Sequence, residues 1–323
     1  MVMTKTIGQK KQFAILSWLN VGVGILLLLA QLVYGHLPLS IQFGYFVLML
    51  LMTGIPHGGL DHVIAKTTAN VNKKQFKIWV FLSRYLFAIA AYSLCWFTLP
   101  SLSLLIFIII SAWHFGETDI ANHKHKSLLS ICRFLWGTMV LMLILLMHKE
   151  ETTEVLIRIS KNAQPVMAFW TACKVYSNSI LITLILTNTF LLTYAYLTKQ
   201  LIFSFSKMLN LLLILAISIY LPLLPSFALY FGGWHAVRSF ELIFDYLHTK
   251  DNFNGESPIK MWIRSLPMSI MAALGFLGLF IYWNQVRFTW DPLPVIFIFL
   301  SVITLPHLDV MDQMIRKDFK TSD

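Results

Sequence analysis

The sequence predicts an all-α protein: a polytopic membrane helix bundle of about ten transmembrane helices that forms a single integral membrane domain over residues 1–323. The prediction rests on composition and on the spacing of the apolar residues. Of the 323 residues, 57% are hydrophobic and only 12% are charged, and the mean hydropathy is +0.70. Soluble domains carry about 25% charged residues. The composition therefore excludes a cytosolic enzyme, a disordered chain and a nucleic-acid-binding module.

The apolar residues are grouped into stretches of the length that a membrane span requires, roughly 20 residues at a rise of about 1.5 Å each. The expected spans cover approximately residues 13–35, 41–57, 79–99, 101–117, 129–148, 176–198, 206–222, 225–247, 264–284 and 293–314. Prolines at 100, 222 and 225 end helices and indicate tight turns between neighbouring spans. The first stretch is longer than the apolar core of a signal peptide, so we expect it to remain as a span.

The basic charge of the chain follows the same topology. There are 25 Lys and Arg residues against 15 Asp and Glu residues. When the spans are threaded with the N-terminus inside, most of the cations fall in loops on one side. The positive-inside rule then predicts a multi-pass protein of the cell (inner) membrane with both termini cytoplasmic. No nucleic-acid partner is expected. The longest outer loop, about 149–175, has the length and composition for a helix at the membrane interface.

Four short segments place histidine beside other polar residues inside apolar spans. They are GIPHGGLDH at 54–62, WHFGETD at 113–119, GGWHAVRS at 232–239 and LPHLD at 305–309. Each lies on an even-numbered span, so all four are expected in the same half of the bilayer. Ionisable side chains at membrane depth usually face the bundle interior or a cavity. The histidines expected to meet there are His57, His114, His235 and His307.

Histidines that project inward from several facing helices are a common way for a bundle to bind a metal. Imidazole is a suitable ligand for iron, zinc, copper and nickel. The alternative is that each histidine is an ordinary hydrogen-bonded residue, which is the commoner role of a single histidine in a span. Four of them on alternate helices at similar depth favour the metal site.

Other polar side chains near these histidines are candidates to orient the imidazoles. Asp61, Glu117 and Asp309 each follow a histidine closely and offer carboxylate acceptors. Arg238 is expected either to pair with Glu117 or Asp61 or to extend towards the membrane surface. His62 is five positions after His57, which places the two side chains about 140° apart around an ideal helix. His62 therefore joins the site only if the chain unwinds at the two glycines that follow His57.

The motifs PHGGLDH at 56–62, WHFGETD at 113–119 and WHAVRS at 234–239 resemble those of the bacteriorhodopsin-related protein family, known as Brp/Blh. The size of the chain, its multi-span hydropathy and the order of the motifs agree with that family over nearly the whole length. Members of the family are membrane β-carotene 15,15'-dioxygenases. They use iron and dioxygen to split the central double bond of β-carotene into two retinal molecules, commonly for a rhodopsin.

The resemblance implies an Fe(II) cofactor, with His57, His114 and His235 as iron ligands. Some members have a further histidine one turn after the WH motif, where this chain has Ser239. The expected fourth ligand is therefore His307, with His62 as the second choice. The implied partners are β-carotene and O2 as substrates, the lipid bilayer, and a rhodopsin through a functional link.

Other functions remain open from the sequence. One is a non-catalytic membrane protein that binds retinal or carotenoid, or that assists rhodopsin assembly. Another is a di-iron lipid desaturase or hydroxylase, although the HxxxH and HxxHH boxes of such enzymes are missing from the sequence. A transporter is a weaker alternative, because no inverted repeat is evident.

Overall fold

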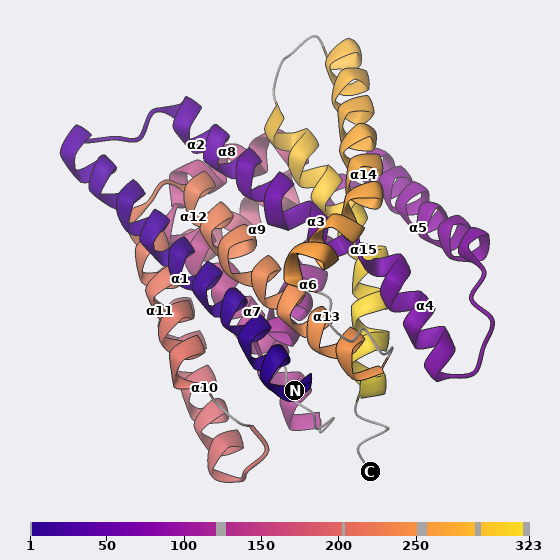
Figure 1. The fold of residues 1–323 in the computed structure, drawn as a ribbon. Coiled ribbons are helices and arrows are strands. Elements are labelled where there is room, and N and C mark those ends of the chain that lie inside the picture. The colour runs from indigo at the N-terminus through magenta and orange to yellow at the C-terminus, as the bar shows by residue number, and fades with distance from the viewer. Residues whose placement is uncertain (1, 121–126, 202–203, 251–256, 288–291, 319–323) are drawn as a thin grey trace.

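A computed structural model describes residues 2–120, 127–201, 204–250, 257–287 and 292–318 of the chain. Its regular structure over these residues is entirely helical, which confirms the predicted all-α fold class (Figure 1). The elements are α1 (Val2–Tyr34), α2 (Leu39–Met49), η1 (Leu50–Gly54), α3 (Ile55–Gly58), α4 (Asp61–Val71), α5 (Ile78–Thr98), α6 (Pro100–Asp119), α7 (Ser127–Met147), α8 (Lys149–Ser160), α9 (Gln164–Val175), α10 (Ser177–Leu197), α11 (Phe205–Tyr220), α12 (Leu223–Tyr230), η2 (Phe231–His235), α13 (Ala236–Lys250), α14 (Pro258–Arg287) and α15 (Pro292–Asp318).

Within the described residues, eight helical segments are long and apolar enough to cross a membrane, so the protein is a membrane protein. They are Lys11–Tyr34, Leu39–Val71, Ile78–Thr98, Pro100–Asp119, Leu128–Met147, Ser177–Leu197, Pro258–Tyr282 and Pro292–Ile315. Each corresponds to one of the ten expected spans.

The other two expected spans form helices that differ from a standard apolar span. The stretch at 206–222 is α11, which has 16 residues. The stretch at 225–247 is an unbroken helix through α12, η2 and α13, and its second half carries several charged residues, among them Arg238 and Glu241. The segment expected to hold an interfacial helix, about 149–175, forms α8 and α9.

Among the described residues, two helices contain one turn that is wider than an α-helical turn. In η1 and in η2 the backbone has π-helical hydrogen bonding over five residues, and the α-helix continues on both sides. Single π turns inside α-helices are rare in proteins overall, but those that occur are often found at functional sites. Both wide turns lie next to a histidine of the predicted site, because His57 follows η1 and His235 ends η2.

The helix α15 lies within the bundle and contacts α4, α5, α6, α8 and α14. In Figure 1, α1, α10 and α11 lie on one side of the molecule and α4 and α5 on the other. The first residues of α1 and the last turns of α15 lie at the same end of the bundle (Figure 1). The elements that carry the predicted site, α3, α6, η2 and α15, meet between these two sides.

A very close helix contact joins α6 to α7. A Cβ atom placed on Gly116 would lie 1.7 Å from the Arg133 carbonyl oxygen, and one placed on Gly137 would lie 1.7 Å from the Ala112 carbonyl oxygen. Such distances are far inside van der Waals contact, so the two backbones touch only because both positions lack a side chain. Small residues at a helix interface permit this approach in membrane bundles. The contact fixes the end of α6 that carries His114.

Candidate metal centre

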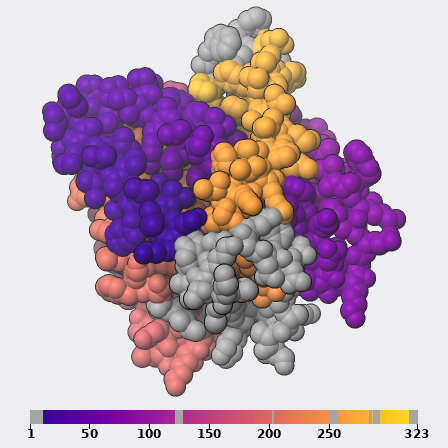
Figure 2. Space-filling model, in the orientation of Figure 1, coloured from indigo at the N-terminus to yellow at the C-terminus, as the bar shows by residue number. Residues whose placement is uncertain are grey.

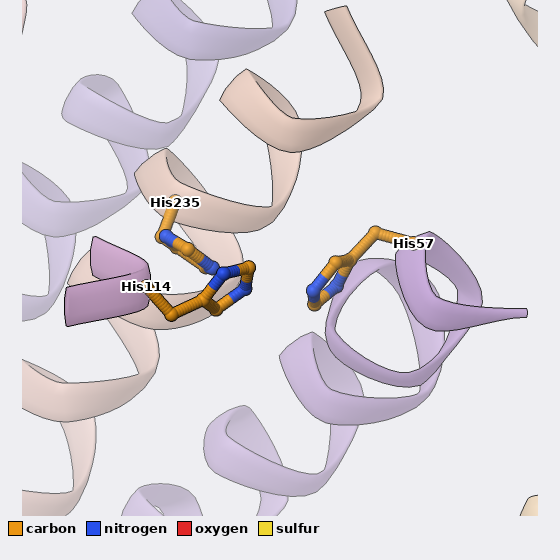
Figure 3. Close-up of side chains that lie close together, drawn as sticks. All are labelled: His57, His114 and His235. Atoms are coloured by element: carbon orange, nitrogen blue, oxygen red, sulfur yellow. The ribbon is translucent and has the colours of Figure 1, made fainter. Parts of the chain in front are cut away.

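Three helical segments bring one histidine each to the centre of the bundle. His57 lies in α3, His114 in α6 and His235 at the end of η2, and all three side chains are buried. One ring nitrogen from each histidine lies within 4.8 Å of those of the other two. Figure 3 shows the three rings around a common space. The structure therefore brings together three of the four histidines that the sequence predicted to meet.

The fourth histidine of the prediction, His307 in α15, lies against this group. Its ring centroid is 4.8 Å from that of His57 and 4.9 Å from that of His114. His307 does not belong to the group of three histidines whose ring nitrogens lie within 4.8 Å of one another. The side chain is buried, and Pro306 precedes it inside the helix.

A hydrogen-bonded carboxylate fixes the His307 ring. Nδ1 of His307 is 2.8 Å from Oδ1 of Asp61, and the hydroxyl of Tyr85 donates to Oδ2 of the same carboxylate over 2.9 Å. The tautomer that suits this contact carries its proton on Nδ1, and the lone pair is then on Nε2. A carboxylate behind a histidine in this way is the usual partner of a metal-ligating imidazole, because it sets both the tautomer and the ring orientation.

The two wide turns are hydrogen-bonded to each other and hold the helices that carry His57 and His235. The Thr53 hydroxyl, in η1, donates to the Gly232 carbonyl of η2 over 2.9 Å. The Asn20 amide of α1 donates to the next carbonyl, that of Gly233, over 2.8 Å. Nδ1 of His57 is 3.3 Å from the Thr53 carbonyl oxygen. If that nitrogen carries the proton, Nε2 of His57 offers a lone pair to the centre.

The hydrogen bonding of the ring nitrogens indicates what this cluster can bind. Within the described residues, both nitrogens of His114, both nitrogens of His235 and Nε2 of His307 are buried without a hydrogen-bond partner. An unpaired buried polar atom costs about 1–3 kcal/mol. A metal ion bound by neutral imidazoles would give these nitrogens a partner. The donor set therefore fits iron, and equally zinc, copper or nickel.

A carboxylate that sequence reasoning did not select positions two of the metal-site segments. Asp119, at the end of α6, accepts hydrogen bonds from Trp136 Nε1 at 2.9 Å, the Tyr230 hydroxyl at 2.8 Å and Trp234 Nε1 at 2.7 Å. These donors belong to α7, α12 and η2, and Trp234 directly precedes His235. The available signal was the acidic residue that ends the WHFGETD motif within an otherwise apolar span.

A cavity of about 460 Å³ opens beside the histidines. His57, His114 and His307 form part of its wall, and most of the remaining wall is aliphatic or aromatic, including Phe227 and Phe297. Along α6 the cavity extends from His114 back to Leu104, a length of about 15 Å at 1.5 Å per residue. The histidines therefore lie towards one end of a long apolar space.

Arg238 has a different partner from either of those that we expected. Its guanidinium lies 2.5 Å from Glu241, one turn further along α13, and Lys207 of α11 is 2.6 Å from the same carboxylate. Arg238 therefore forms its ion pair with neither Asp61 nor Glu117. Glu117 is buried on α6 and interacts electrostatically with Arg133 of α7.

Two further candidates lie away from the centre. Asp309 is exposed and accepts a hydrogen bond from Gln313, four residues later on α15, over 2.8 Å. The expectation that Asp309 orients an imidazole of the cluster is therefore wrong. The helix does break after Gly58, as His62 would need, but Nδ1 of His62 is 3.1 Å from the Gly59 carbonyl oxygen. His62 lines the cavity without joining the three-histidine group.

Comparison with known proteins gives two matches. A sequence model of the family described as beta-carotene 15,15'-dioxygenase matches residues 48–315, a range that includes all four histidine segments. A curated relative from an uncultured marine bacterium, 66A03, is named beta-carotene 15,15'-dioxygenase. It is 27% identical over 274 residues, which cover 83% of this chain and 92% of the relative. No solved structure matches the chain.

Proposed function

The chain belongs to the β-carotene 15,15'-dioxygenase family, and on that premise we propose that it is an iron-dependent membrane dioxygenase that cleaves the central double bond of β-carotene with O2 to give two retinal molecules. The observation that carries the proposal is a group of buried, unpaired imidazoles in the wall of a long apolar cavity. The first feature suits a metal and the second suits a hydrocarbon, and His114 and His307 belong to both.

The proposed iron ligands are His57, His114 and His235, with His307 as the fourth. The short nitrogen separations within the first three support their assignment. The assignment of His307 is supported by its ring contacts with His57 and His114 and by the Asp61 carboxylate behind it. Bound Fe(II) would supply redox chemistry and the open coordination positions that dioxygen activation requires.

The chain itself contributes position and exclusion of water. Asp61, Thr53 and Asp119 hold the helices and rings that bear the imidazoles. The apolar wall offers few groups that could hydrogen-bond to water, and it orients a hydrocarbon by shape alone. Holding the reacting double bond beside the site of oxygen activation is the main contribution that a protein makes in such a reaction.

The length of the cavity supports cleavage near the middle of the substrate. An extended chain advances about 1.2 Å per bond, so the roughly nine bonds between the central double bond and one terminal ring of β-carotene span about 11 Å. With the ring added, half of the molecule matches the approximately 15 Å over which the cavity follows α6. One half of the carotenoid would then fill the cavity while its centre lies beside the histidines.

The proposed setting is the cell (inner) membrane, with several spans and both termini cytoplasmic. The distribution of cations between the loops supports this orientation. β-Carotene dissolves in the hydrocarbon core of such a membrane, and retinal is released into it. A rhodopsin in the same membrane is the proposed user of the product.

The test is expression of the chain in bacteria that produce β-carotene. The expected result is loss of the orange pigment, appearance of retinal, and consumption of oxygen. His57→Ala should abolish all three while the protein remains in the membrane. The exposed His36 is the matched control, and His36→Ala should behave like the unsubstituted chain. Unchanged pigment despite verified expression would count against the proposal.

The same experiment separates the main alternatives. A chain that binds carotenoid or retinal without catalysis would copurify with pigment and consume no oxygen. A di-iron desaturase or hydroxylase would contain two irons per chain and would modify lipid.

A further inference from the structure

One part of the cavity wall consists of side chains that also face the outside of the protein. On α5, Leu86 lines the cavity and is 56% exposed. On α14, Met271 lines the cavity and is 54% exposed, and the neighbouring wall residue Gly275 is exposed as well. By contrast, the wall residues Ile144 and Leu224 are buried. The cavity therefore approaches the surface between α5 and α14.

Among the described residues, α5 and α14 pack on a common neighbour rather than closely against each other. Each contacts α15, and α14 also contacts α3 while α5 contacts α6. Figure 1 shows α14 and α5 diverging, and Figure 2 shows them as separate projections at the top and at the right of the molecule. Within the part of the chain that the structure describes, a Cβ atom on Gly275 would meet no atom within 4 Å, which is consistent with open space beside this face of α14.

The surroundings of this gap are those of the membrane interior. Leu86 lies near the middle of the span Ile78–Thr98, and Met271 near the middle of Pro258–Tyr282. Exposed neighbours on both helices are large and apolar, such as Phe87 and Leu274. An opening at this depth and with this rim faces lipid rather than water.

We propose that the gap between α5 and α14, bounded by Leu86, Met271 and Gly275, is the lateral entrance through which the hydrocarbon substrate passes from the bilayer into the cavity. This inference rests on the proposed function for the identity of the substrate. The absence of a side chain at Gly275 keeps the entrance wide, and the flexible, unbranched side chain of Met271 can move aside as the substrate passes.

A matched pair of substitutions on α14 isolates this role. Gly275 and Gly278 are both exposed, and at neither would a Cβ atom meet an atom of the described residues within 4 Å. Only Gly275 lines the cavity. Gly275→Trp and Gly278→Trp therefore add the same bulk to the same helix, and only the first places that bulk at the entrance.

The experiment supplies β-carotene in lipid vesicles to membranes that contain each variant and measures retinal formation at limiting and at saturating β-carotene. With Gly275→Trp, we expect the rate at limiting substrate to fall about tenfold, with a smaller change at saturation, because substrate access rather than chemistry is obstructed. Gly278→Trp should remain within about twofold of the unsubstituted protein. Equal rates for the two tryptophan variants would overturn the proposal.

A second measurement does not depend on turnover. The protein is purified under anaerobic conditions from β-carotene-producing cells, and bound pigment is quantified by visible absorption. Less pigment per chain in Gly275→Trp than in Gly278→Trp supports the entrance, whether or not the protein forms retinal. Absence of retinal formation would refute the proposed function but not the entrance. Equal pigment refutes the entrance. If Gly275→Trp does not accumulate, Gly275→Leu replaces it, with Gly278→Leu as its control.

Discussion

Two parts of the cavity wall differ in how closely their helices pack. One part is formed by α6 and α7, and the other by α5 and α14. Between α6 and α7 the backbones touch at Gly116 and Gly137. Between α5 and α14 the wall residues are partly exposed, and a Cβ atom on Gly275 would have no atom of another described segment within 4 Å. Glycine therefore has opposite uses in the two regions. In the first it permits a rigid contact beside His114, and in the second it leaves room for a substrate.

The comparison predicts that an added side chain will have its largest effect in the tight wall. Gly137→Leu would place Cβ 1.7 Å from the Ala112 carbonyl oxygen, and no rotamer change can relieve a clash with backbone. We expect the folded protein to be lost from the membrane. Gly278→Leu, in the open region, should accumulate normally. Immunoblots of membrane fractions and thermal stability in detergent measure the difference, and normal accumulation of Gly137→Leu would contradict the described α6–α7 contact.

The next largest effect is expected at His114, which lies beside the close contact between α6 and α7. His114→Ala removes a ring whose two buried nitrogens have no protein partner among the described residues. We therefore expect retinal formation to disappear while thermal stability without metal stays the same or rises, because no protein hydrogen bond is lost. Retinal assays and melting curves of metal-free protein test this. A large destabilisation of the metal-free variant would indicate a structural role.

A smaller effect is expected at the residue that orients His307. Asp61→Asn keeps the shape of the side chain but changes its hydrogen bonding to His307 and Tyr85. Loss of such a carboxylate typically lowers metal affinity about 10- to 100-fold. Activity should therefore return when more iron is supplied, which simple misfolding would not allow. Asp309→Asn, at an exposed site on α15, is the control and should not change the iron requirement.

The smallest effect is expected at the hydrogen bond between the two wide turns. Thr53→Val keeps the shape of the side chain and removes the bond to the Gly232 carbonyl. The free energy of unfolding should fall by about 1 kcal/mol. Denaturation followed by tryptophan fluorescence measures this change. An unchanged free energy of unfolding would mean that packing alone joins the two helices. The close approach of Gly232 to Met49 would then be the next contact to test.

The sequence was sufficient to predict the helical membrane fold and the gathering of its histidines. Apolar stretches of span length and histidines at similar depth are local features, and the structure places His57, His114 and His235 together. The ion pair of Arg238 was also present in the sequence, since Glu241 lies three residues further along the same helix face. The histidine motif at 232–239 ends before Glu241, so the motif alone does not reveal this pair.

Other features depend on contacts that no local pattern reveals. The partner of His307 is Asp61, 246 residues away, whereas the sequence selects Asp61 because it closely follows His57. The three donors that converge on Asp119 come from segments far apart in the chain. Wide turns leave little trace in composition, so the sequence does not predict the π turn η2 inside the span expected at 225–247.

The central claim is that the clustered imidazoles bind one iron. The most direct measurement is the iron content of protein purified after loading with Fe(II) under anaerobic conditions, together with X-ray absorption at the iron edge. The account predicts one iron per chain with a shell of imidazole nitrogens, and loss of that iron in His57→Ala, His114→Ala and His235→Ala but not in His36→Ala. Two irons per chain, or iron that persists in all three histidine variants, would contradict it.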